Sequence, residues 1–73
     1  MESSYWYSKA TLTLDENRLR AGTLIQCARR WENLGPEDRL RAAIRLASPV
    51  DGLTTLNGEE IASLATRPGY RFA

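Results

Sequence analysis

The chain has no histidine and only one cysteine, Cys27, among its 73 residues. Without histidine, the commonest zinc ligand is missing, and so is the base of Ser-His and Cys-His catalytic pairs. A single cysteine cannot form an internal disulfide. Cys27 falls on the apolar side of a helical pattern, where we expect a small buried residue and not a nucleophile. The sequence therefore predicts no enzyme, no metal site and no cofactor.

Long apolar runs are missing as well. The runs present are only a few residues long, far below the ~20 residues that cross a bilayer. The start, MESSYWYSKA, lacks the basic region and apolar stretch of a secretory signal. The formal net charge is +1, so the overall composition does not require a strongly anionic partner. We expect a cytoplasmic monomer without membrane contact.

A helical pattern dominates the middle of the chain. From Leu24 to Leu34, apolar residues recur at intervals of three and four, as on one face of an amphipathic helix. Asp15 is predicted to cap the start of this segment, and Gly22 is predicted to bend or fray its first turns. Gly35-Pro36 then suits the end of one helix and the first turn of the next.

Two further helices are predicted after this junction. The first covers residues 37–47 and is ended by Ser48-Pro49. Its buried side carries Leu40, Ala43, Ile44 and Ala47. Asn57 is predicted to cap the second, a helix of about two turns. Residues 10–14 and 53–56 alternate like short strands and are predicted to pair with each other as a ribbon. The predicted fold class is therefore mainly α: a small three-helix domain, with a short two-stranded β ribbon added, and a flexible aromatic N-terminal arm.

Basic residues gather between residues 17 and 45, where seven arginines stand against three carboxylates. One interpretation is an ordinary solvated surface, in which Glu37 and Asp38 pair with Arg41 for a few tenths of a kcal/mol each. The other is a helix-turn-helix across Gly35-Pro36. Its second helix would offer arginines to phosphates but few side chains to base edges. We favour the first, because DNA readers are usually more basic; a small DNA-binding repressor stays as the alternative function.

Half of the six aromatic residues stand together near the start, as Tyr5, Trp6 and Tyr7. They either fold back over a thin core or form an exposed arm that docks on a partner, since Tyr and Trp are enriched at binding hot spots. Both interpretations stay open. We assign residues 1–9 to a flexible arm and residues 10–73 to a small helical binding domain.

The whole chain, with its start MESSYWYSKATL and its arginine-rich middle, resembles the small RNA polymerase-binding transcription regulators of lytic Xanthomonas bacteriophages. The resemblance implies binding to the β′ N-terminal region and the β flap near the RNA exit channel of the host enzyme. It also implies inhibition of host promoter initiation and antitermination at intrinsic terminators, in the cytoplasm of the infected bacterium. A protein that blocks some other macromolecule is a third alternative.

The same resemblance implies two sets of partner-binding residues. The aromatic arm would dock on the polymerase, and arginines would face acidic polymerase surface or the nascent RNA. The implied residues are Tyr5, Trp6, Tyr7, Arg29, Arg30, Arg41 and Arg45.

Overall fold

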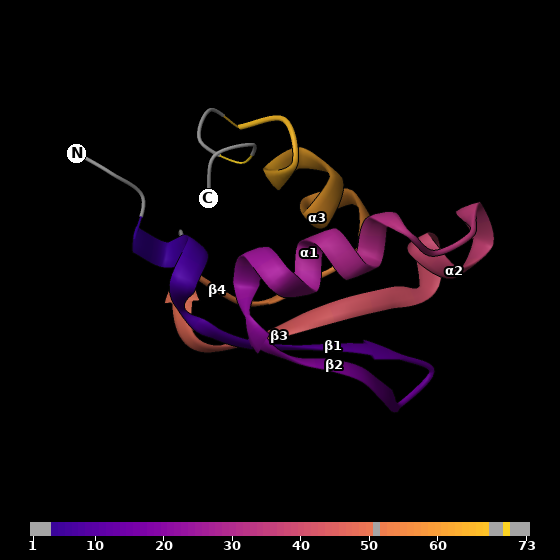
Figure 1. Ribbon diagram of the computed structural model, residues 1–73, viewed down its shortest axis with the longest axis horizontal. Helices are drawn as coiled ribbons and strands as arrows, with labels where there is room; N and C mark the ends of the chain where they lie inside the picture. The colour runs from indigo at the N-terminus through magenta and orange to yellow at the C-terminus, as the bar shows by residue number, and fades with distance from the viewer. Residues whose placement is uncertain (1–3, 51, 68–69, 71–73) are drawn as a thin grey trace.

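The computed structural model of the chain has a four-stranded antiparallel sheet with helices packed on one side of it (Figure 1). It describes residues 4–50, 52–67 and 70, without the side chains of residues 4 and 5. The elements in chain order are the 3-10 helix η1 (Ser4–Tyr7), β1 (Lys9–Leu14), β2 (Asn17–Thr23), α1 (Leu24–Glu32), α2 (Pro36–Arg41), β3 (Ala42–Val50), β4 (Leu53–Leu56) and α3 (Gly58–Leu64).

The sheet has the strand order β2-β1-β3-β4, so the predicted mainly α class is wrong. The ribbon predicted between residues 10–14 and 53–56 is also wrong, because β3 lies between β1 and β4 and pairs with both of them. The two short strands themselves are confirmed. β3 begins inside the helix predicted over residues 37–47, and it is one of the two central strands of the sheet.

The helix predicted over residues 37–47 ends at Arg41, and the chain continues directly as β3. In β3, Ala42, Ile44 and Leu46 are buried, while the residues between them face away from the core. This alternation is the period of a strand. The correction extends to Leu40, which was predicted to be buried and is 76% exposed.

The predicted helix start at Asp15 is wrong as well. Asp15 and Glu16 form the turn of the β1–β2 hairpin and have φ values of 50° and 71°. Two-residue hairpin loops favour positive φ, which Asp tolerates better than most residues. The residue types that suit a helix cap thus also suit this turn.

Of the later helix boundaries, Pro36 and Asn57 are as predicted, whereas the start of α1 after Thr23 was not predicted. α1 begins after Thr23, whose hydroxyl accepts a hydrogen bond from the Gln26 amide while the Gln26 side chain accepts one from the Thr23 amide. Pro36 opens α2, as predicted. Asn57 caps α3 through the same reciprocal arrangement with Glu60. Capping boxes of this kind satisfy amides that a helix start leaves unpaired.

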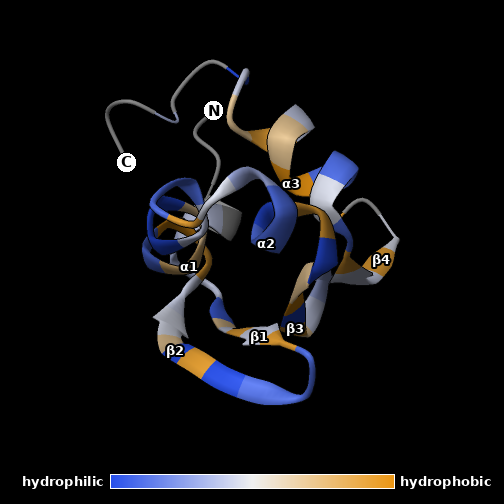
Figure 2. Cartoon of the chain, turned by 90° about the vertical axis from the view of Figure 1, so that its right-hand side faces the viewer, coloured by the Kyte–Doolittle hydropathy of each residue, from blue (hydrophilic) through white to orange (hydrophobic). Residues whose placement is uncertain are grey.

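The hydrophobic core fills the space between the sheet and the helices α1 and α3. Its most deeply buried large side chains are Leu12, Leu24, Ile44, Ile61 and Cys27. Figure 2 shows α2 as a largely hydrophilic element beside this core, which agrees with its lack of buried residues. Within the described residues, the helices cover only one face of the sheet, and the other face is open (Figure 1).

α3 approaches α2 closely at Gly58. A β-carbon on Gly58 would lie 2.5 Å from the backbone oxygen of Arg39 and 3.3 Å from the Cα of Leu40. Since both neighbours are backbone atoms, they can move away only if the helices separate. Gly58→Ala is expected to lower the free energy of unfolding by about 1–3 kcal/mol, measured by urea denaturation. Ser63→Ala, exposed on the same helix, is the control and is expected to change stability by less than about 0.5 kcal/mol. Equal stability of both variants would contradict the close packing.

Candidate functional site

The open face of the sheet is built by alternation along β1. Ala10 and Leu12 of β1 point into the core, so Lys9, Thr11 and Thr13 lie on the opposite face. Register partners in an antiparallel sheet share a face. Thr11 is paired with Arg45 of β3, and Thr13 with Arg18 of β2, so both arginines join the open face.

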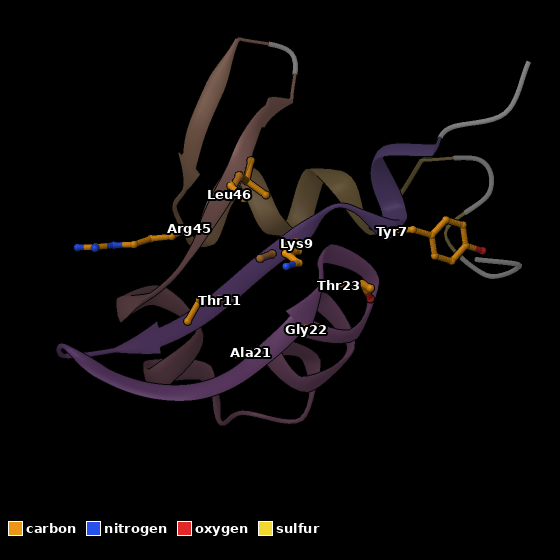
Figure 3. A pocket seen from close by; sticks show the side chains of 10 residues that line it. Tyr7, Lys9, Thr11, Ala21, Gly22, Thr23, Arg45 and Leu46 are labelled. Carbon is orange, nitrogen blue, oxygen red and sulfur yellow. The ribbon is translucent and has the colours of Figure 1, made fainter.

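Two adjoining hollows are lined by residues of this face, and the first also includes Ala10 and Leu46 of the buried side in its lining. Thr11 and Arg45 line both of them; Tyr7 and Lys9 line the first, and Arg18 the second. We call the joined hollows the sheet groove, and define it by Lys9, Thr11, Thr13, Arg18 and Arg45. Figure 3 shows the Arg45 side chain extending from β3 at one end of the first hollow and Tyr7 at the other. Small residues of the neighbouring strands, Ala21, Gly22 and Ala47, leave the first hollow open.

The sheet groove is electropositive. Lys9, Arg18 and Arg45 are exposed, and none of them forms an ion pair within the described part of the chain. Glu16 also lines the groove, beside Arg18. Three cations and one carboxylate therefore share this surface, and the cations are available to an anionic ligand.

The aromatic residues near the start differ in how far they are buried. Trp6 is 2% exposed, belongs to the core and contacts the ring of Tyr70 at 5.5 Å between centroids. Tyr7 is 61% exposed. Tyr5 lies on η1, and its side chain is outside the described part of the structure. Of the segment assigned to a flexible arm, residues 4–7 form η1 and Lys9 begins β1.

The four predicted arginines lie on different parts of the surface. Arg29 donates a hydrogen bond from Nη2 to the backbone oxygen of Tyr70 at 3.3 Å and stacks near its ring. Arg30 is exposed on α1. Arg41 pairs with Asp38 at 3.0 Å, as the sequence predicts, and with Asp15 at 3.2 Å. Of the predicted residues, Arg45 and Tyr7 line the first hollow together.

Two titratable side chains are perturbed by burial. Desolvation, followed by the nearby Glu32 charge, raises the pKa of Tyr70 to about 12. Burial also raises the pKa of the Cys27 thiol, whose Sγ donates to the backbone oxygen of Arg20 at 3.7 Å. A thiol with a raised pKa is protonated at neutral pH and is a poor nucleophile. The prediction of a small buried residue at Cys27 is confirmed.

Lys9, Thr11, Thr13 and Arg18 were not predicted as site residues. The alternation of residues 10–14 indicates which side of β1 is polar, but only the pairing with β2 and β3 brings the two arginines beside it. The structure also differs from the helix-turn-helix that was considered across Gly35-Pro36. Its expected second helix has only the six residues of α2, and Arg45 lies on a strand.

No family model, no curated protein and no solved structure matches the chain. None of the helices in residues 4–50 and 52–67 has the length and apolar character needed to span a membrane. The likeness to phage polymerase regulators stays a prediction from the sequence.

Proposed function

We propose that the chain is a non-catalytic transcription regulator that binds host bacterial RNA polymerase. Its contacts would be with the β′ N-terminal region and the β flap near the RNA exit channel. The resemblance of the whole chain to phage regulators motivates this choice of partner. The observation that carries the proposal is Tyr7, an exposed tyrosine held beside a buried tryptophan.

Tyr7 is well placed to anchor a protein contact. Tyrosine is one of the residue types that dominate binding energy at protein interfaces. The burial of Trp6 fixes η1 against the core, so the backbone of Tyr7 is already ordered before binding. An ordered anchor loses less conformational entropy on association than one in a flexible arm. Arg30, exposed on α1, can add a charged contact to an acidic surface of the polymerase.

The proposed position explains the two proposed effects. The described part of the chain measures 35 × 21 × 19 Å, large enough to obstruct a neighbouring protein or RNA element. Beside the exit channel, such a body would oppose σ-dependent initiation at host promoters. It would also hinder the RNA hairpin that triggers intrinsic termination, and so favour antitermination.

Capture of purified core RNA polymerase by the immobilised chain tests the proposal. Tyr7→Ala is expected to weaken capture by about 30-fold or more, the equivalent of a hot spot of about 2 kcal/mol. Leu40→Ala is the matched control, because it also removes an exposed apolar side chain but lies on α2, at the end of the molecule opposite η1 (Figure 1). Its capture is expected to equal that of the wild-type chain.

Two results would contradict the proposal. One is no capture of the polymerase by the wild-type chain; the other is equal loss with Tyr7→Ala and Leu40→Ala. Deletion of residues 1–9 is a poorer test, because it would remove Trp6 from the core and Lys9 from β1.

A further inference from the structure

We propose that the sheet groove binds the phosphate backbone of a single-stranded nucleic acid, and we use RNA as the probe. This goes beyond the proposed function and does not depend on it, since the groove would bind RNA in the absence of polymerase. The argument uses the positions of the groove residues, their charges and the shape of the surface.

The cations of the groove surround a polar row on β1. Alternate residues of a strand are about 6.8 Å apart, so Lys9, Thr11 and Thr13 form a row along one face. Arg45 lies beside Thr11 on one neighbouring strand, and Arg18 lies beside Thr13 on the other. Adjacent strands are about 4.8 Å apart, which places the two arginines on opposite sides of the row.

The free hydrogen-bonding groups of the groove are mainly donors. Guanidinium groups form paired hydrogen bonds with phosphate, and a lysine adds a point charge. The hydroxyl of Thr13 donates to the backbone oxygen of Ala43 at 3.4 Å, whereas that of Thr11 makes no hydrogen bond within the described part of the chain. Thr11 can therefore donate to a ligand between Lys9 and Arg45.

The available charge distinguishes this surface from other arginines of the chain. Arg41 is engaged by two carboxylates, at 3.0 and 3.2 Å. Arg29 is engaged by Tyr70. The three groove cations have no such partner among the described residues, so binding a polyanion would not require an internal ion pair to break.

The hollow shape favours a single strand over a duplex. Proteins read duplex DNA mainly by inserting a protruding helix or ribbon into a groove of the DNA. The sheet groove is instead a recess on an open sheet, the kind of surface along which single strands lie. The cations offer contacts to phosphates and not to base edges, so binding should be independent of sequence.

Fluorescence anisotropy of the full chain with a labelled oligouridylate of about 12 nucleotides tests the proposal. Three phosphate contacts on a single strand predict that log K falls with log salt concentration with a slope of about −2. The affinity is expected to fall by about 20-fold between 50 and 200 mM salt. In the same measurement, single-stranded DNA of equal length is expected to bind with a similar salt dependence, because it offers the same phosphates, and duplex DNA is expected to bind more weakly.

Arg18→Gln and Arg20→Gln form a matched pair of variants. Both arginines are exposed and lie on β2, where a register shift opposite Leu12 and Thr13 interrupts the alternation. Arg20 is paired with Leu12 and Arg18 with Thr13, so the two lie on opposite sides of the sheet. Arg18→Gln, Lys9→Gln and Arg45→Gln are each expected to reduce the magnitude of the slope by about 0.7. Arg20→Gln is expected to leave it unchanged. Far-UV circular dichroism confirms that each variant is folded.

Three results would overturn the proposal: no binding of the oligouridylate at 50 mM salt, an equal effect of Arg18→Gln and Arg20→Gln, or tighter binding of duplex DNA. The assay contains no polymerase, so its failure would leave the proposed function intact.

Discussion

Trp6→Ala is expected to lower the free energy of unfolding by about 3–5 kcal/mol. The tryptophan ring is 2% exposed, packs with the rest of the core and contacts Tyr70. Its removal would leave a cavity beneath η1 and lose apolar burial at the same time. A domain of 73 residues is expected to have a total stability of only about 4–11 kcal/mol. The variant is therefore expected to lose a large fraction of its stability.

Urea denaturation of Trp6→Ala and its neighbour Tyr7→Ala measures this difference. Tyr7 is exposed, and its replacement is expected to change stability by less than about 0.5 kcal/mol. Equal stability of the two variants would show that the aromatic segment does not belong to the core. The pair also defines which aromatic residue can be used in binding experiments, since loss of binding by an unfolded variant carries no information on an interface.

Leu46→Ala is expected to cost about 2–5 kcal/mol, because Leu46 is 8% exposed and lies on the buried side of β3. Leu40→Ala, in contrast, is expected to cost less than about 0.5 kcal/mol. The helix predicted from the sequence would give the opposite order of stability loss, because Leu40 belongs to its buried side and Leu46 does not. The two variants thus test the strand directly.

Thermal unfolding followed by circular dichroism compares these leucines under identical conditions. A shift in Tm of several degrees per kcal/mol is expected for a domain of this size. A larger loss of stability with Leu40→Ala than with Leu46→Ala would support a helix over residues 37–47 and contradict β3.

The segment 42–50 shows why sequence patterns gave the wrong fold class. Leu40, Ala43, Ile44 and Ala47 fit a helical period, while Ala42, Ile44 and Leu46 fit a strand period. Both periods are present in the same residues, so local pattern does not decide between them. The pairing of β3 with β1 and β4 decides between them. β1 lies about thirty residues earlier in the chain and β4 follows β3, so a local pattern within residues 42–50 contains neither partner.

The boundaries that were predicted correctly depend on local chemistry. The Asn57 cap of α3 involves residues three positions apart, and Pro36 acts on its own turn. The Thr23 cap of α1 is just as local, but it was not predicted, because Asp15 was assigned that role. The candidate site depends instead on pairing between strands that are distant in the sequence. Arg45 was selected as a basic helix residue, but its neighbours in the sheet groove are set by the register of three strands.

β1 contributes to the core with one side and to the sheet groove with the other. In a strand, insertion of one residue exchanges the two sides for every position beyond it. An insertion near Lys9 would turn threonines toward the core and leucines toward the groove. Individual side chains on either side of β1 can therefore vary independently, whereas an insertion that no bulge absorbs would disturb the core and the sheet groove together.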